Sequence, residues 1–249
     1  MDHIIDYIKI AVLNHSGNVG KSTICNTLLM PRIEGAELIR VETINEDGST
    51  GEKLAAKDMT NVIEKIDMLD KAVIDIGSSN IENFIKGIKE NVGSHEDIDV
   101  YLLPVTPDIK QQKDTVNSIY ELNDLGINPE FIGVLLNRVD SSLPLESQFN
   151  VLCDSGVLEQ TATNEIRKCV IIPESEVFTL IDLINTSYHE AVNDDTDYRK
   201  AIREAKDKQT RSGLSLNKSC HRLAKSLDEK LDIEFKKLTQ VFNMAVNLR

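Results

Sequence analysis

Tryptophan is absent from this 249-residue chain, and aromatic residues make up only 4% of it. Proteins that bind single-stranded nucleic acid stack the bases on aromatic side chains, so the composition argues against that class. Cations are also scarce, because 28 Lys and Arg stand against 41 Asp and Glu, a formal net charge of −13. The chain as a whole should therefore repel nucleic acid and anionic lipid, and binding either would need a local basic patch.

Cysteine pairs at metal-binding spacing are missing as well. The four cysteines, Cys25, Cys153, Cys169 and Cys220, include no C-x-x-C pair, so a zinc site is not expected. No apolar run approaches the ~18 residues of a membrane span. The start of the chain, "MDHIIDYIKI", is acidic and unlike a secretory signal peptide. These features predict a cytoplasmic protein with free thiols.

Short apolar runs that alternate with helical patterns predict the fold. The runs are 8–13, 37–43, 72–76, 100–105, 131–136 and 169–173, and helical spacing is found in 22–29, 54–69, 81–89, 109–125 and 144–165. This alternation is typical of an α/β fold with a parallel sheet and helices on both faces. From about Leu180 the pattern favours helix to Arg249. We therefore expect an α/β domain over residues 1–185 and a helical C-terminal extension over 186–249.

The segment after the first predicted strand, "NHSGNVGKST", ends like a phosphate-binding loop. The usual pattern is G-x-x-x-x-G-K-[ST], and here His15 stands in place of its first glycine. Such a loop gathers backbone N–H groups around phosphate, while its lysine reaches the β- and γ-phosphates and its hydroxyl binds Mg²⁺. The predicted phosphate contacts are Gly17, Asn18, Val19, Gly20, Lys21, Ser22 and Thr23. The alternative is an ordinary glycine-containing turn.

A carboxylate follows the apolar part of the third predicted strand. Asp75 ends "AVID", where a second acidic ligand would hold Mg²⁺ directly or through water. We therefore predict a metal site of Ser22 and Asp75, with Lys21 and Asp75 as the catalytic residues. A strand-end Asp that caps a turn is the alternative.

The motif "NRVD" at residues 137–140 follows the fifth predicted strand. Small GTPases use N-K-x-D at this place to read guanine, which favours GTP. They also have D-x-x-G at the metal strand, whereas Asp75 and Gly77 are one residue too close for that pattern. A solvated loop is the third interpretation.

With these segments in order, the chain resembles the ParA/MinD group of P-loop ATPases. The resemblance covers residues 5–185 and rests on "NHSGNVGKST", "VIDIGSS", "VYLLPVTPDIKQQKDTV", "GVLLNRVD" and "VIIPESEVFTLID". Within the group the chain is most similar to the StbB plasmid-stability proteins of conjugative plasmids. This resemblance implies a bacterial cytoplasmic homodimer that binds ATP or ADP with Mg²⁺ and a partner protein of a plasmid stability system. It also implies base contacts by Asn137, Arg138, Pro173 and Glu174.

Two departures from the group concern hydrolysis. The group's loop, x-K-G-G-x-G-K-[ST], carries a lysine that crosses to the phosphates of a partner subunit, and Ser16 stands at its place. The group's catalytic aspartate lies in a D-x-D pattern after the second strand, where Glu42 and Ile44 align. Glu42, Glu46 and Asp47 are the candidates for orienting the attacking water. We expect slow hydrolysis of ATP to ADP and phosphate, with a non-hydrolysing adaptor or a GTPase as the alternatives.

Basic residues gather near the end of the chain. Residues 199–225 hold nine cations against Glu204 and Asp207, a charge of +7, which leaves −20 on the remainder (−13 minus +7). Such asymmetry suggests an anionic partner, and a solvated helix face is the alternative. ParA-like proteins use basic C-terminal surfaces for non-specific DNA. The resemblance therefore implies DNA contacts by Arg199, Lys200, Arg203, Lys206, Lys208 and Arg211.

The last predicted helix is amphipathic, with its apolar residues on one face. Leu231, Phe235, Leu238, Phe242 and Ala245 make up that face. MinD-like proteins hold membrane with such a helix, but interfacial helices need a strongly cationic polar face, which this one lacks. We therefore expect the helix to pack on the α/β domain and not on a membrane.

Overall fold

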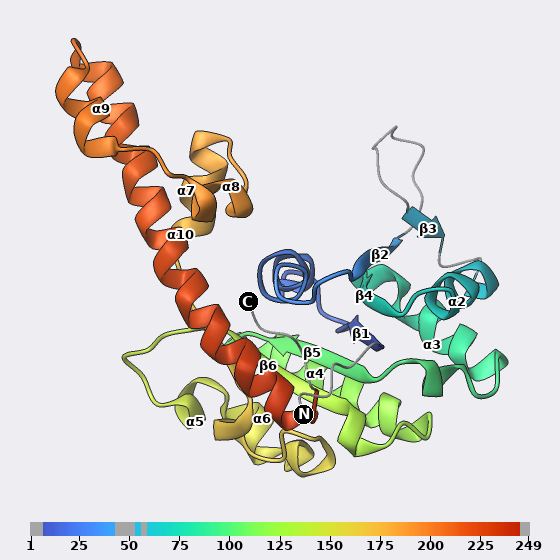
Figure 1. Ribbon diagram of the computed structural model, residues 1–249. Helices are drawn as coiled ribbons and strands as arrows, with labels where there is room; N and C mark the ends of the chain where they lie inside the picture. The colour runs from blue at the N-terminus through green and yellow to red at the C-terminus, as the bar shows by residue number, and fades with distance from the viewer. Residues whose placement is uncertain (1–6, 43–52, 56–58, 245–249) are drawn as a thin grey trace, which may run out of the picture. The chain divides into compact units, whose positions relative to one another are not determined.

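A parallel sheet of seven strands forms the centre of the computed structural model, which describes residues 7–42, 53–55 and 59–244 (Figure 1). The strands are β1 (Ile8–Val12), β2 (Glu37–Glu42), β3 (Lys53–Ala55), β4 (Lys71–Ile76), β5 (Val100–Val105), β6 (Ile132–Val139) and β7 (Val170–Pro173). Their order across the sheet is β3-β2-β4-β1-β5-β6-β7. The order reverses around β1, and ligands of α/β sheets bind at the carboxyl ends of strands at such a point.

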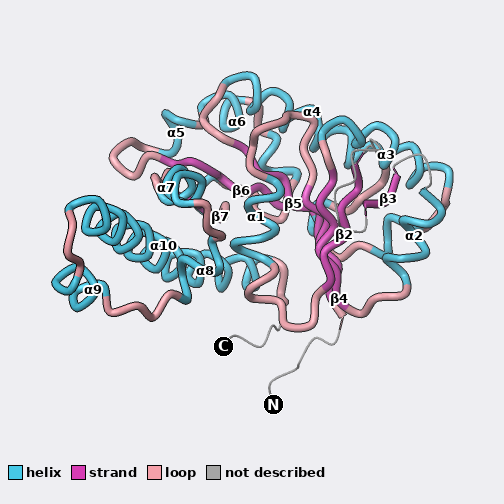
Figure 2. Tube along the Cα trace, turned by 90° about the horizontal axis from the view of Figure 1, so that it is seen from above, coloured by secondary structure: helices cyan, strands magenta, loops and turns pink. Residues whose placement is uncertain are grey.

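Helices cover both faces of this sheet, as the sequence predicted. The helices of the described residues are α1 (Lys21–Ile24), α2 (Met59–Asp67), α3 (Ile81–Glu90), α4 (Ile109–Asp124), α5 (Leu145–Gln148), α6 (Asn150–Asp154), α7 (Val177–Ile184), α8 (Tyr188–Asn193), α9 (Tyr198–Glu204) and α10 (Lys208–Val241). In both ribbon and tube views α2, α3 and α4 lie on one face and α1 on the other (Figures 1 and 2).

Alternation along the strands explains this layering. Ala11, Ile74 and Leu103 belong to one buried cluster with Phe84 of α3 and Ile119 of α4. Successive side chains of a strand point to opposite faces, so their neighbours face the α1 side. Asp75 is one of these neighbours, and this places its carboxylate on the same side of the sheet as the loop before α1.

The structure differs from the sequence prediction between residues 53 and 69. A helix was predicted over 54–69, but 53–55 form β3, which pairs with Arg40–Glu42 of β2, and α2 begins at Met59. A three-residue edge strand is too short for a period-2 pattern to show, so the helical spacing of the following segment dominated the prediction. Similarly, the helix predicted over 144–165 consists of the short α5 and α6 and further turns.

Contacts within the chain divide it into two units. One unit is Met1–Pro173 with Glu234–Arg249, and the other is Glu174–Ile233. Helix α10 is continuous across the boundary at residues 233/234. The boundary predicted at 185/186 falls inside the second unit, because α7 groups with the helices that follow it.

The end of α10 packs within the first unit, which confirms that part of the prediction for the last helix. Phe235 and Leu238 are fully buried. The Phe242 ring lies so close to Gly133 of β6 that a Cβ there would be 2.5 Å from its Cζ. Ala245, the remaining member of the predicted apolar face, lies outside the described residues.

Candidate functional site

The loop that follows β1 adopts the backbone conformation of an anion-binding curl. Asn18 and Gly20 have φ of 57° and 90°, in the left-handed region, and the Val19 side chain between them is fully buried. Alternating right- and left-handed residues turn successive N–H groups toward a common concavity, which suits phosphate. The loop lies at the carboxyl edge of the sheet, beside β4 and β5.

Lys21 is buried at the start of α1. Its Nζ donates hydrogen bonds to the carbonyl oxygens of Asn14 (3.1 Å) and Ser16 (2.9 Å), so the loop's own backbone orients the ammonium group. Burial lowers the pKa of Lys21, and the nearby Asp75 carboxylate partly opposes that shift. A buried cation with two hydrogen bonds to the loop has one ammonium proton left for a further acceptor.

Asp75 faces Lys21 from the neighbouring strand. It pairs in register with Val12 of β1 and Arg40 of β2, and its carboxylate accepts a hydrogen bond from the Ser22 hydroxyl. Burial raises the pKa of Asp75, while Ser22, Lys21 and Arg40 act in the opposite direction. A hydroxyl and a carboxylate in contact are the hard oxygen donors that Mg²⁺ prefers, so these two residues fit the predicted metal site.

Asn137 braces the second half of the loop. It is buried at the end of β6, and its Nδ2 donates to the Val19 carbonyl at 2.8 Å. A Cβ at position 20 would lie 2.4 Å from this nitrogen, so the loop requires Gly20 both for its φ and for this approach. A base contact by Asn137 stays a prediction.

The other residues predicted to contact the base or water lie in different settings. Arg138 is exposed with φ of 55°. Exposed Asp140 accepts hydrogen bonds from the backbone N–H and the hydroxyl of Ser142. Pro173 ends β7 opposite Val139, whereas Glu174 belongs to the second unit. Glu42 ends β2, and Glu46 and Asp47 lie outside the described residues.

Two residues near the loop were missed in the sequence. Arg40 lies beside Asp75 in the sheet, and its one signal was a cation within the apolar run "ELIRVET". Asn14 is fully buried at the end of β1, where its side chain bonds to a neighbouring strand and helix. No spacing rule marks an asparagine of this kind, because its partners lie about 100 residues away in the chain.

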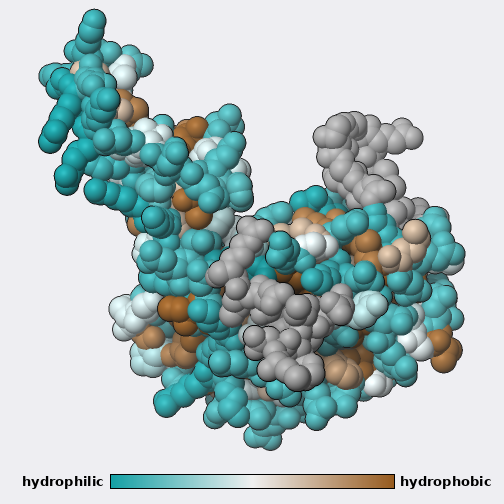
Figure 3. Space-filling view, viewed as in Figure 1, coloured by the Kyte–Doolittle hydropathy of each residue, from teal (hydrophilic) through white to brown (hydrophobic). Residues whose placement is uncertain are grey.

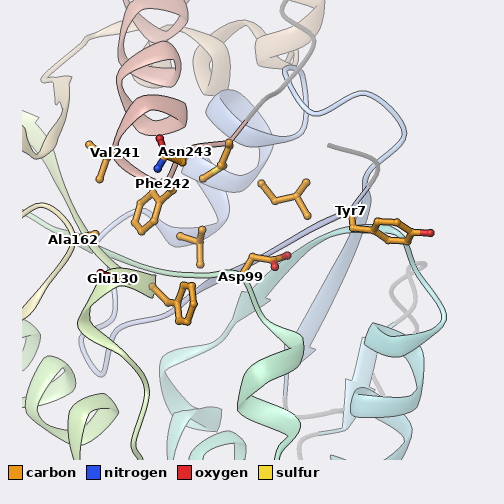
Figure 4. A pocket seen from close by; sticks show the side chains of 11 residues that line it. Tyr7, Asp99, Glu130, Ala162, Val241, Phe242 and Asn243 are labelled. Atoms are coloured by element: carbon orange, nitrogen blue, oxygen red, sulfur yellow. The ribbon is translucent and has the colours of Figure 1, made fainter. Parts of the chain in front are cut away.

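A cavity of ≈ 480 Å³ lies elsewhere in the first unit (Figure 4). It is found where β1, β5 and β6 begin, with Asp99, Glu130 and Phe242 in its lining. It is therefore at the amino edge of the sheet, opposite the loop. The predicted site residues within the described ranges are not among those that line it.

Comparison with known proteins gives matches only among solved structures. No family model and no curated protein matches the chain. Similar structures include MinD cell division protein of Aquifex aeolicus, with 14% identity over 85% of this chain and 95% of that one, at a TM-score of 0.45. The cell division ATPase MinD of Pyrococcus furiosus has 16% identity, covering 86% and 99%, at 0.45.

The McdA–ATP complex of Cyanothece is a third similar structure, with 12% identity over 94% of this chain and 96% of that one, at 0.47. At identities of 12%, 14% and 16% these structures share a fold with the chain and do not establish its activity. Among the helices that the structure describes, none combines the length and apolar character needed to cross a membrane.

Proposed function

We propose that this chain binds ATP with Mg²⁺ through the loop at residues 14–23. The buried pair of Lys21 and Asp75 carries the proposal. Burial lowers the pKa of the amine and raises that of the carboxyl, so both charges are held at a cost in free energy. Perturbed groups of this kind gather at functional sites, and a polyphosphate with a divalent cation would neutralise both.

Different residues of the site are proposed to contact the phosphates, the metal and the base. Lys21 contacts the β- and γ-phosphates, and Gly17 to Thr23 offer backbone and hydroxyl donors to them. Ser22 and Asp75 would hold Mg²⁺, which would offset the negative charge of the phosphates. Asn137, Arg138, Pro173 and Glu174 are the proposed base contacts.

Melting experiments with nucleotides of different length test this proposal. A ligand that binds the folded state alone raises the unfolding temperature with its concentration. ATP with Mg²⁺ should raise it, and AMP, which lacks the β- and γ-phosphates, should not. Equal shifts with ATP and AMP, or no shift with either ATP or GTP, would contradict the proposal.

Hydrolysis is proposed to be slow. Ser16 has no charge and a short reach, so it cannot act as a cation that stabilises phosphates across a dimer. Steady-state phosphate release, measured with and without DNA and partner protein, decides between a slow ATPase and a non-hydrolysing adaptor. Turnover under any of these conditions supports the enzyme, and none under all of them supports the adaptor.

GTP is the competing ligand, since "NRVD" contains the Asp140 that would read guanine. The Asp140 carboxylate already accepts two hydrogen bonds from Ser142, and this turn would have to open for the carboxylate to accept the guanine N–H groups. We therefore favour ATP. Competition of GTP against bound ATP tests this choice, and displacement by GTP at lower concentration than by ATP would reverse it.

At the level of the cell, we propose a ParA-like switch in plasmid stability, partition or positioning in the bacterial cytoplasm, with a link to conjugation. The five sequence segments in order and the parallel sheet support it. Nucleotide would act on residues 42–50 and 104–112, and so control a homodimer or a partner protein surface. Residues 104–105 already lie in β5 and residues 109–112 in α4, so a change there would be a shift of formed elements. Of the first segment, only Glu42 lies within the described residues.

Non-specific DNA is the proposed ligand of the basic segment in the second unit. Arg199, Lys200, Arg203, Lys206, Lys208 and Arg211 are all exposed on α9, the following turn and the start of α10. Figure 3 shows a strongly hydrophilic surface over these elements. An exposed cationic surface is what contact with phosphate backbones requires.

A further inference from the structure

The first half of the phosphate loop is tied to helix α4. Asn14 Nδ2 donates to the Pro104 carbonyl (2.9 Å) and to Thr115 Oγ1 (2.7 Å), and its Oδ1 accepts from the Ser16 N–H (2.8 Å). Asn14 is fully buried, so these bonds are made away from water. A single side chain thus fixes both the loop backbone and its distance from α4.

His15 adds a second tie to the same helix. Its Nε2 lies 2.6 Å from Oε2 of Glu121, and its backbone N–H donates to Ser118 Oγ at 3.4 Å. The two paired side chains are 27% and 33% exposed, so the contact is partly shielded from water. Thr115, Ser118 and Glu121 are three residues apart and therefore share one face of α4.

The contacts of Asn14 and His15 with α4 also affect the position of Lys21, through the loop backbone. The carbonyl groups of Asn14 and Ser16 hold the Lys21 ammonium group, and they flank His15 in the chain. Movement of residues 14–16 away from α4 would displace both acceptors at once. The position of Lys21 therefore depends on how firmly this half of the loop is held.

We propose that His15 and Glu121 form a latch that presets the phosphate loop and its lysine for the polyphosphate of a nucleotide. The inference rests on the proposed nucleotide-binding function and names two positioning residues for it. The usual loop has glycine at this place, which can make no such side-chain contact. Preorganisation raises affinity because the bound conformation needs no further ordering when the ligand arrives.

The hydrogen bond from His15 also offsets the negative charge of Glu121. The Glu121 carboxylate lies beside a loop that is proposed to bind phosphates, and it accepts a hydrogen bond from the His15 ring. Removing His15 leaves an unpaired negative charge near the ligand and loosens the loop. Both effects weaken binding, so they act in the same direction.

Paired substitutions and titration calorimetry with ATP and Mg²⁺ test the latch. His15→Ala should weaken binding about five- to tenfold, the loss expected for one charge-assisted hydrogen bond, and Glu121→Ala should weaken it less, because that change also removes a negative charge near the phosphates. The double variant should be no weaker than either single one, since the two residues act through one contact. His15→Gln and Glu121→Gln, which keep a donor and an acceptor, should restore most of the affinity.

Two measurements keep the latch apart from its alternatives. Glu146→Ala breaks the exposed ion pair with Arg167 and is the matched control, with unchanged affinity expected. Hydrogen exchange of the amides at 16–21 in the nucleotide-free protein should quicken in His15→Ala and return toward the original rate in His15→Gln. Additive losses, or unchanged affinity and exchange in both alanine variants, would overturn the latch.

A failure of the proposed nucleotide binding can be told apart from a failure of the latch. If the unaltered protein binds neither ATP nor GTP, nucleotide binding is wrong. The hydrogen-exchange comparison alone then decides the latch: quicker exchange in the alanine variants supports it, and equal exchange contradicts it.

Discussion

At the scale of single residues, Lys21 and Asp75 form a pair that weakens the empty protein. The pKa of Asp75 is raised above 3.8, so the folded state binds this proton more tightly than the unfolded chain does. The free energy of unfolding therefore falls as the pH rises from the pKa of Asp75 in the unfolded chain to its higher pKa in the folded state. The loss persists at neutral pH. Under the proposed function, this loss of stability keeps a charge that the bound metal would use.

Asp75→Asn should accordingly stabilise the nucleotide-free protein at neutral pH. The amide keeps an acceptor for Ser22 and removes the buried charge, while Lys21 keeps its two carbonyl partners. We expect a rise in unfolding temperature, because a neutral amide is buried at a lower cost in free energy than a carboxylate. The gain should vanish toward pH 3.8, where Asp75 itself is protonated.

Binding of ATP with Mg²⁺ should weaken in the same Asp75→Asn variant, since the metal loses a carboxylate. Asp154→Asn serves as the control, because that carboxylate is exposed at the end of α6. A lower unfolding temperature of the empty Asp75→Asn protein, or unchanged Mg²⁺ dependence of binding, would contradict the assignment of this site.

Gly20 gives a second prediction at this scale. Gly20→Ala combines a φ of +90° with a Cβ 2.4 Å from Asn137 Nδ2, whereas Gly93 has a φ of +96° with nothing within 4 Å. Gly93→Ala should cost about 1 kcal/mol of stability through backbone strain alone. Gly20→Ala should cost about 1–3 kcal/mol more through overpacking, and should also weaken nucleotide binding. Equal losses in urea unfolding of the two variants would show that Asn137 does not brace the loop.

Among the elements, the end of α10 provides hydrogen-bond partners for backbone groups at the β7 edge of the sheet. Strand β7 lies at that edge, with the Ile171 N–H donating to the Glu234 carboxylate at 2.8 Å. Lys237 Nζ in turn donates to the Cys169 carbonyl at 2.6 Å. Edge strands with free backbone groups invite pairing with other chains, and these two side chains remove that opportunity here.

Glu234→Ala should therefore destabilise the first unit. It leaves the Ile171 N–H unpaired, at a cost of about 1 kcal/mol, and should lower the unfolding temperature by about 2–4 °C. Glu229→Ala, at an exposed position of the same helix, is the matched control. Thermal unfolding followed by circular dichroism measures both, and the account of the edge fails if the two variants melt alike.

The elements show what sequence can and cannot predict. The six strands with long apolar runs were predicted because parallel strands buried on both faces are continuously apolar. Strand β3 was missed because its pairing with β2 decides its conformation and its three residues carry no pattern. Lys21, Ser22 and Asp75 were found from local motifs, whereas the roles of Asn14, Arg40 and Glu121 depend on neighbours brought together by the fold.

At the scale of the whole molecule, charge is divided along the chain. Residues 199–225 carry +7 and the remainder carries −20 (−13 minus +7). A local cationic segment in an acidic protein favours contact with polyanions while the rest of the surface limits it. Affinity for DNA should then depend on these residues and fall steeply with salt.

Reversal of two of these charges tests the DNA proposal. Arg203→Glu with Lys206→Glu should weaken binding to a DNA duplex strongly and lower the slope of log affinity against log salt by about 0.9 for each lost phosphate contact. Lys86→Glu with Lys89→Glu on α3 changes the net charge equally and is the control. Equal losses of DNA affinity for the two pairs, measured by fluorescence anisotropy, would show that net charge alone decides binding and that residues 199–211 are not the DNA contact.

Under the proposed function, the loop at residues 14–23 holds a nucleotide through Lys21. Titration calorimetry of ATP with Mg²⁺ against the unaltered protein and Lys21→Ala tests it most directly, with circular dichroism to show that the variant is folded. We predict saturable binding by the unaltered protein and none by a folded Lys21→Ala variant, because the buried ammonium group is the cation that meets the phosphates. Equal affinity in the two proteins would contradict the claim.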